Sequence, residues 1–97
     1  MQYLIITRDN GDIEWGNHGE LLQREAAHVW GLYKSGCIRN IWFTKGKDAV
    51  LLAERENENA ARAMIDELPL VKEGLLLYSL EELLPYTGIE RLFHGTN

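Results

Sequence analysis

Hydrophobic residues along the chain fall into short clusters separated by turn-forming residues, and this pattern predicts four strands and two helices. Runs of apolar and β-branched residues predict strands at residues 2–8, 37–44, 49–54 and 74–80. The segments 17–34 and 57–68 instead repeat apolar residues every three or four positions, which predicts helices. The "KGKD" turn between the second and third strands predicts a hairpin.

Capping residues set the expected ends of the helices. Asn17 is expected to cap the first helix, and either Asn57 or Asn59 the second, because asparagine side chains accept hydrogen bonds from the first free N–H groups of a helix. Gly36 and Pro69 are expected to end them. The element order then predicts an α+β, ferredoxin-like βαββαβ protomer over residues 1–81, with a four-stranded antiparallel sheet and both helices on one face.

The predicted strands are apolar on both faces, although only one face can pack on the helices. Triplets such as Leu4-Ile5-Ile6 and Leu75-Leu76-Leu77 place apolar side chains on each side of a strand. The face without helices must therefore be covered, and we expect the same face of a second subunit to cover it in a homodimer. The alternative is that residues 82–97 fold over this face. These residues form an apolar tail that is expected to dock on the same or a partner subunit.

The first predicted helix carries a carboxylate among its apolar residues. With Leu22 at zero on a wheel of about 100° per residue, Glu25 falls at about 300°, and His28 follows one turn later. A carboxylate that faces a sheet must be paired, hydrogen-bonded or protonated with a raised pKa, and a raised pKa suits a general acid or base. Glu25 and His28 are therefore candidate catalytic residues. In the structural alternative, Glu25 reaches water or pairs with Arg39, and His28 is a surface residue.

The second predicted strand supplies candidate substrate-binding residues. Strict alternation places Arg39 on one face with Ile41, and Asn40 and Trp42 on the other face with Ile38. A guanidinium can form two parallel hydrogen bonds to a carboxylate, and an indole can stack on a planar ring. We therefore expect Arg39, Asn40 and Trp42 to hold a small organic acid or an aromatic ligand. Alternatively, Trp42 only fills the core.

Composition narrows the classes of partner. The chain has 97 residues and a net charge of −5, with its ten Lys and Arg residues scattered, which argues against nucleic acid and anionic membranes as partners. No metal-ligand spacing and no glycine-rich phosphate loop occurs in the sequence, so no cofactor and no metal is predicted. The single cysteine and the lack of a long apolar run favour a cytoplasmic protein.

Three stretches carry a resemblance to a known family. "LYKSGCIRNIWF", "ARAMIDELPLV" and "PYTGIERLF" resemble the muconolactone isomerase-like group of dimeric α/β-barrel proteins, in which a helix ends in Gly, a strand carries Arg and Trp, and Leu-Pro-Leu closes the second helix. The resemblance implies a sheet packed on a partner's sheet, and for the enzyme itself a cofactor-free 1,3 proton transfer in a small unsaturated lactone carboxylate. Glu25 falls near that enzyme's acidic stretch, where a lysine accompanies the acid, whereas alanines follow Glu25 here.

These observations leave three functions open. The chain is a proton-transfer isomerase or related small-molecule enzyme with Glu25 as the base, a ligand-binding module with the same pocket but no chemistry, or an assembly protein whose aromatic residues serve only the core and interfaces. A double-bond shift needs a base and no cofactor, which agrees with the candidate residues. We therefore favour the enzyme.

Overall fold

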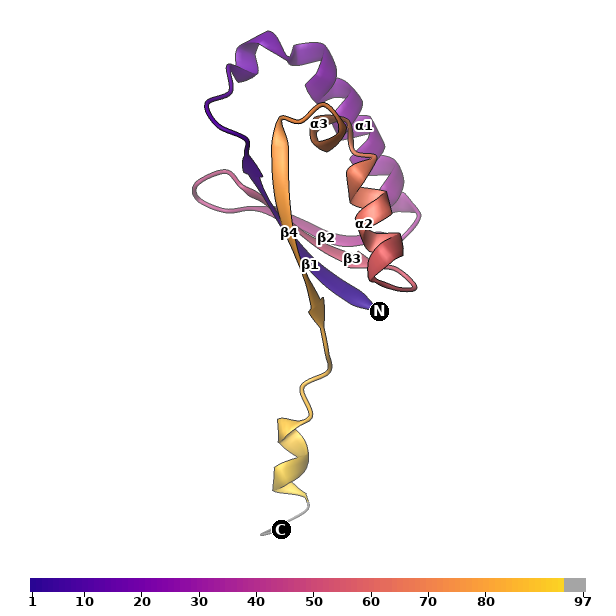
Figure 1. Cartoon of the computed structure of the whole chain (residues 1–97). Helices are drawn as coiled ribbons and strands as arrows, with labels where there is room; N and C mark the ends of the chain where they lie inside the picture. Colours follow the sequence, from indigo (N-terminus) through magenta and orange to yellow (C-terminus); the bar gives the residue numbers. More distant parts are fainter. Residues whose placement is uncertain (94–97) are drawn as a thin grey trace.

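The computed structural model describes residues 1–93 and contains the predicted order of strands and helices. Its regular elements are β1 (Gln2–Asp9), α1 (Gly19–Lys34), β2 (Ile38–Phe43), β3 (Ala49–Glu54), α2 (Glu58–Asp66), α3 (Pro69–Lys72) and β4 (Leu76–Leu83), with 3-10 turns η1 (Trp15–Asn17) and η2 (Gly88–Leu92). The strands form one antiparallel sheet in the order β2-β3-β1-β4. The helices lie on one side of it (Figure 1), so the predicted ferredoxin-like arrangement is confirmed.

Local sequence explains most of the helix boundaries. Asn57 caps α2 as predicted, because its Oδ1 accepts a 2.8 Å hydrogen bond from the backbone N–H of Ala60. Gly36 follows α1 with a φ of +83°, the left-handed conformation that glycine adopts most easily. The predicted cap at Asn17 is wrong: this residue closes the turn η1, and His18 occupies the N-cap position of α1 without a side-chain hydrogen bond.

Pro69 separates two helices rather than ending one. The helix α2 ends at Asp66, and Pro69 is the first residue of the short helix α3, a position where its missing N–H is no loss. Leu68 before it is extended, with a ψ of 131°. The last strand begins two residues later than predicted, because Gly74 adopts a φ of +79° and the N–H of Leu75 bonds to the carbonyl of Leu70.

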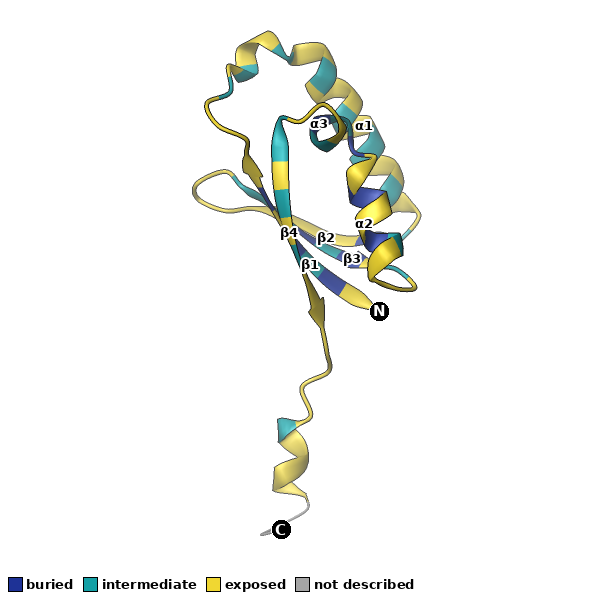
Figure 2. Ribbon diagram, viewed as in Figure 1, coloured by how far each residue is buried: buried dark blue, intermediate teal, exposed yellow. Residues whose placement is uncertain are grey.

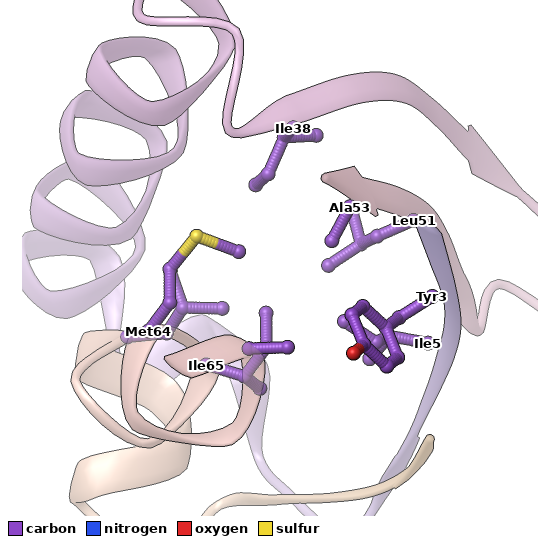
Figure 3. Close-up of a cluster of buried hydrophobic side chains, with 9 residues drawn as sticks. Tyr3, Ile5, Ile38, Leu51, Ala53, Met64 and Ile65 are labelled. Carbon is purple, nitrogen blue, oxygen red and sulfur yellow. The ribbon is translucent and has the colours of Figure 1, made fainter. Parts of the chain in front are cut away.

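The core lies between the sheet and α2. Figure 3 shows side chains from β1 and β3 pointing toward Met64 and Ile65 of α2. The helical spacing predicted over residues 57–68 is confirmed, because four apolar residues at this spacing are buried: Ala61, Met64, Ile65 and Leu68. The strand residues packed against them are Tyr3, Ile5, Ile38, Leu51 and Ala53.

The opposite side of the sheet has no helix over it (Figure 2). We call it the open sheet face. The strand register places seven apolar side chains on it: Leu4, Ile6, Trp42, Val50, Leu52, Leu77 and Leu83. Four of these remain exposed, Trp42 by half of its surface. Both faces of the sheet are therefore apolar, as the sequence predicts, but only the helix side is covered within this chain.

The residues after β4 extend away from the domain instead of folding over the open sheet face (Figure 1). They give the chain extents of 60 × 27 × 20 Å and a radius of gyration of 16.5 Å, against about 12.5 Å for a compact chain of this length. The accessible surface is 7015 Å², whereas a monomer of 11.1 kDa is expected to expose roughly 5,650 Å². The chain thus exposes about 1,400 Å² more than a self-contained domain of its mass. Residues 94–97 of the predicted tail lie outside the described residues.

Candidate functional site

Glu25 points from α1 toward the start of α3. Its Oε1 accepts a hydrogen bond of 3.0 Å from the backbone N–H of Leu70, the second residue of α3. The first N–H groups of any helix lack partners inside that helix, so this carboxylate satisfies a donor that would otherwise be unpaired. Glu25 is half-buried, and it forms no ion pair with Arg39 or any other residue among residues 1–93.

The surroundings of Glu25 raise the pKa of its carboxyl. Burial raises the pKa of the carboxyl above its ordinary value, and this effect exceeds the opposing effects of the Leu70 hydrogen bond and of His28. His28 is half-buried one turn further along α1, where the predicted i, i+3 contact can form. The carboxyl is thus held in one position and retains its proton to a higher pH than an exposed glutamate. This is the property that a general acid or base requires.

The raised pKa predicts how stability varies with pH. Since the folded chain holds the Glu25 proton more tightly than the unfolded chain, the stabilisation is complete below the ordinary carboxyl pKa of 4.5 and is lost as the pH rises through the raised value. We expect Glu25→Gln to become increasingly more stable than the wild type between pH 4 and pH 7. Chemical denaturation at fixed protein concentration measures this difference. Glu20→Gln, at an exposed position of the same helix, is the control and should show no such trend.

The predicted substrate-binding residues do not gather around Glu25. A β-bulge lies between Ile38 and Asn40, so that Arg39 is an extra residue in β2. Asn40 and Trp42 pair with residues of the open sheet face, on the far side of the sheet from α1. Arg39 is exposed at the edge of the sheet, and its Nη1 lies 3.8 Å from where a Cβ on Gly36 would be.

The bulge also corrects the predicted faces of β2. Ile38 pairs with Ala53 on the helix side, together with Ile41, and not with Asn40 and Trp42. One inserted residue reverses the alternation of side chains beyond it, which is why a strict period of two failed here. A single extra residue leaves no signal in the sequence pattern, because Arg39 fits either face of an edge strand.

A second polar cluster lies at the start of α1 and was missed by the sequence reasoning. Trp15 donates a 3.0 Å hydrogen bond to Asp9 Oδ2, and its ring meets that of His18 edge to face. Beside it is an open pocket of about 320 Å³, lined by Asn17, His18, Glu20, Leu21, Arg24 and Glu73. Glu73 directly follows α3 and is about 50 positions from the other lining residues in the sequence, so sequence spacing could not reveal this grouping. Within residues 1–93, no group of three or more His, Cys, Asp or Glu is arranged to bind a metal.

Comparison with known proteins identifies the fold. No protein-family model and no curated protein matches the sequence. A crystal structure of muconolactone isomerase superposes with a TM-score of 0.77 over 91% of this chain and 93% of that chain, at 14% identity. The chain has the fold of muconolactone isomerase. The resemblance stated from the three sequence stretches is therefore confirmed at the level of fold.

The muconolactone isomerase fold also occurs in a second similar structure. A 5-chloro-2-hydroxyhydroquinone dehydrochlorinase from Burkholderia phenoliruptrix, in complex with 2,5-dihydroxybenzoquinone, superposes with a TM-score of 0.64 at 21% identity. The match covers 87% of this chain and 94% of that chain. At these identities the shared feature is the fold, because one fold supports many activities. Among the described residues, no helix combines the length and the apolar character needed to cross a membrane.

Proposed function

We propose that the chain is a small-molecule enzyme related in activity to muconolactone isomerase. In this proposal the chain transfers a proton within a small unsaturated acid or lactone, without a cofactor. The observation that carries this proposal is the Glu25 carboxyl: it is half-buried, it has a raised pKa, and the N–H of Leu70 fixes it in place. Two structures with this fold are named as enzymes of small organic compounds, which supports an enzymatic function for this chain.

The geometry of Glu25 suits a proton that leaves one carbon and returns to another. The bond from Leu70 occupies Oε1, and no hydrogen bond to Oε2 occurs in residues 1–93. The ionised Oε2 would remove a proton from a carbon next to a carbonyl, leaving a dienolate, and the protonated carboxyl would return that proton to the far end of the conjugated system. We assign His28 the role of stabilising the ionised carboxylate before the first step and after the second, because it lowers the pKa of Glu25.

Arg39 stays a predicted substrate-binding residue, at a place separate from Glu25. It is exposed just beyond the C-terminal end of α1, on the edge strand β2, where its guanidinium is available for a substrate carboxylate. We place Asn40 and Trp42 in a contact between copies instead, because they lie on the open sheet face. The proposed catalytic site therefore consists of Glu25 and His28, and Arg39 lies apart from it at the edge of the sheet.

Proton exchange with solvent tests the proposal without knowledge of the natural substrate. The wild-type chain is incubated in D₂O with muconolactone, and the probe is followed by proton NMR. We expect deuterium to enter the positions that gain a proton, at a rate proportional to enzyme concentration, because the proton that Glu25 takes up can exchange with solvent while the dienolate is still bound. Exchange at the rate of buffer alone, with muconolactone and with related unsaturated lactone acids, would contradict the proposal.

A non-catalytic module for ligand binding or assembly is the second candidate. It is favoured by the hydrogen bond between Glu25 and Leu70, because that bond gives the carboxylate a structural role that needs no substrate. In this case muconolactone would bind without exchange, or would not bind at all. Titration calorimetry with the same probe separates these outcomes from turnover.

We further propose that the chain works as at least a homodimer in which two open sheet faces pack together. Each partner in a stable complex buries roughly 800 Å², and the excess accessible surface of about 1,400 Å² per chain, to which the projecting residues after β4 also contribute, leaves room for a contact of that size. The face carries apolar side chains on all four strands, and a two-fold axis can bring such a face against itself.

A further inference from the structure

The turn between α3 and β4 is connected to the Glu25 carboxyl by backbone hydrogen bonds. The N–H of Leu75 donates a 2.9 Å hydrogen bond to the carbonyl of Leu70, and the N–H of Leu70 donates to Glu25 Oε1 at 3.0 Å. Gly74 reverses the chain before Leu75 with a φ of +79°, a conformation that residues with side chains rarely adopt. The placement of the Leu70 N–H is therefore coupled to the geometry of this turn.

Asn10 holds the same turn from the end of β1. Its Nδ2 donates a 2.9 Å hydrogen bond to the carbonyl of Gly74, and its backbone N–H donates to the carbonyl of Leu75, also at 2.9 Å. Asn10 directly follows β1 and lies 64 positions before Gly74 in the sequence. A continuous series of hydrogen bonds thus runs from Asn10 through the turn and Leu70 to Glu25.

The helix α3 is too short to fix its own direction. Its four residues, Pro69–Lys72, make about one turn, and a single helical turn is not stable by itself. The buried side chains of Leu68 and Leu70 keep α3 against the core, but the burial of apolar surface has no preferred direction. A hydrogen bond weakens steeply when its angle is poor. The bonds that anchor the end of α3 therefore decide where the Leu70 N–H points.

We infer that Asn10 is a positioning residue for the Glu25 carboxyl. It acts through the turn and Leu70, because its own side-chain hydrogen bond goes to Gly74 and not to Glu25. A role for Asn10 in the reaction rests on the proposed function, since a catalytic carboxylate needs supporting hydrogen bonds that hold it in a productive geometry.

The Leu70 N–H is the part of the surroundings of Glu25 that depends on the turn. Burial raises the pKa of the carboxyl, whereas the Leu70 hydrogen bond and the charge of His28 lower it. His28 lies on α1 itself. Lys72, the one ionisable residue of α3, is engaged in another ion pair, and Arg39 of β2 forms none with Glu25 within residues 1–93. Loosening the turn should therefore weaken the Leu70 hydrogen bond, which raises the pKa of Glu25 further.

Carboxyl NMR of the full chain tests this role without any substrate. The glutamate side-chain carboxyls are labelled with ¹³C, and the Glu25 signal is identified by its loss in Glu25→Gln. Asn10→Ala removes the hydrogen bond to Gly74 at an exposed position, and in this variant the titration midpoint of Glu25 should move to higher pH. The amide proton of Leu70 should also follow the Glu25 titration less strongly than in the wild type, because its bond to the carboxylate is weaker.

Asn57→Ala provides a matched control for this substitution. It also deletes one side-chain hydrogen bond of an exposed asparagine, the 2.8 Å bond from the N–H of Ala60 to Asn57 Oδ1. This bond caps α2 and has no link to the turn, so the Glu25 midpoint should equal that of the wild type. An unchanged midpoint in Asn10→Ala, or an equal shift in both variants, would overturn the positioning role of Asn10.

Kinetics with muconolactone separate this role from the proposed function. The acid limb of the pH–rate profile should move to higher pH in Asn10→Ala by the same interval as the NMR midpoint, because the base must be ionised to remove a proton from carbon. A chain that shows no turnover would contradict the proposed function, whereas a shifted NMR midpoint in Asn10→Ala alone would still support the positioning of the carboxyl.

Discussion

Replacing Glu25 with glutamine is expected to lower the rate of deuterium incorporation into muconolactone by at least about 100-fold, the smallest contribution usual for a general acid or base. The amide cannot take up a proton from carbon, whereas its oxygen can still accept the hydrogen bond from Leu70. The fold should therefore persist. The initial rate in D₂O, measured for wild type and variant at equal concentration, gives the ratio.

Two controls make the loss of rate specific. Glu20→Gln makes the same chemical change at an exposed position of α1, so its rate should match that of the wild type. The unfolding free energy of Glu25→Gln at pH 7 should be equal to or higher than that of the wild type, because the ionised carboxylate is poorly solvated in the fold. A Glu25→Gln chain with undiminished exchange would remove Glu25 from the proposed mechanism.

The same substitution connects function to stability. A buried carboxylate with a raised pKa weakens the fold when it is ionised, and glutamine would satisfy Leu70 without this loss. Sites that carry out chemistry often retain residues that reduce stability. A rate that falls while stability rises would identify Glu25 as catalytic, whereas a change in stability alone would favour the ligand-binding or assembly module.

The sequence predicted those parts of the fold that depend on neighbouring residues. Asn57 caps α2 by bonding to a backbone group three residues away, and Gly36 adopts a conformation set by its own missing side chain. The apolar face of α2 likewise follows from the helical period alone. Asn17 failed as a cap because η1 forms ahead of α1, and two competing turns of this kind look alike in a sequence.

The candidate site was predictable only in part. The helical wheel correctly turned Glu25 inward, because the direction of a side chain on a helix follows from its position. Its partner, the N–H of Leu70, is 45 positions away in the sequence, and only the tertiary fold brings it to Glu25. The bulge at Arg39 moved Asn40 and Trp42 to the open sheet face, and no local preference announces a bulge of one residue.

The sheet contact is expected to fail when a charge is placed at its centre. We expect Ile6→Glu to convert the proposed dimer into a monomer of about 11.1 kDa by sedimentation equilibrium. Ile6 lies on the central strand β1 of the open sheet face, with Val50 and Ser79 as its strand neighbours. Two-fold symmetry would bring both new carboxylates into one contact, where two like charges repel and each loses its contact with water.

Ile41 provides a matched control for this substitution. Both isoleucines lie in strands of the same sheet and are almost equally exposed, Ile6 by 38% and Ile41 by 39%. They differ in the face that they occupy, since Ile41 pairs with Leu51 on the helix side. Ile41→Glu should therefore stay dimeric. Loss of the dimer with both substitutions would indicate a general effect of charge, and a dimer that survives Ile6→Glu would show that the open sheet faces do not pack together.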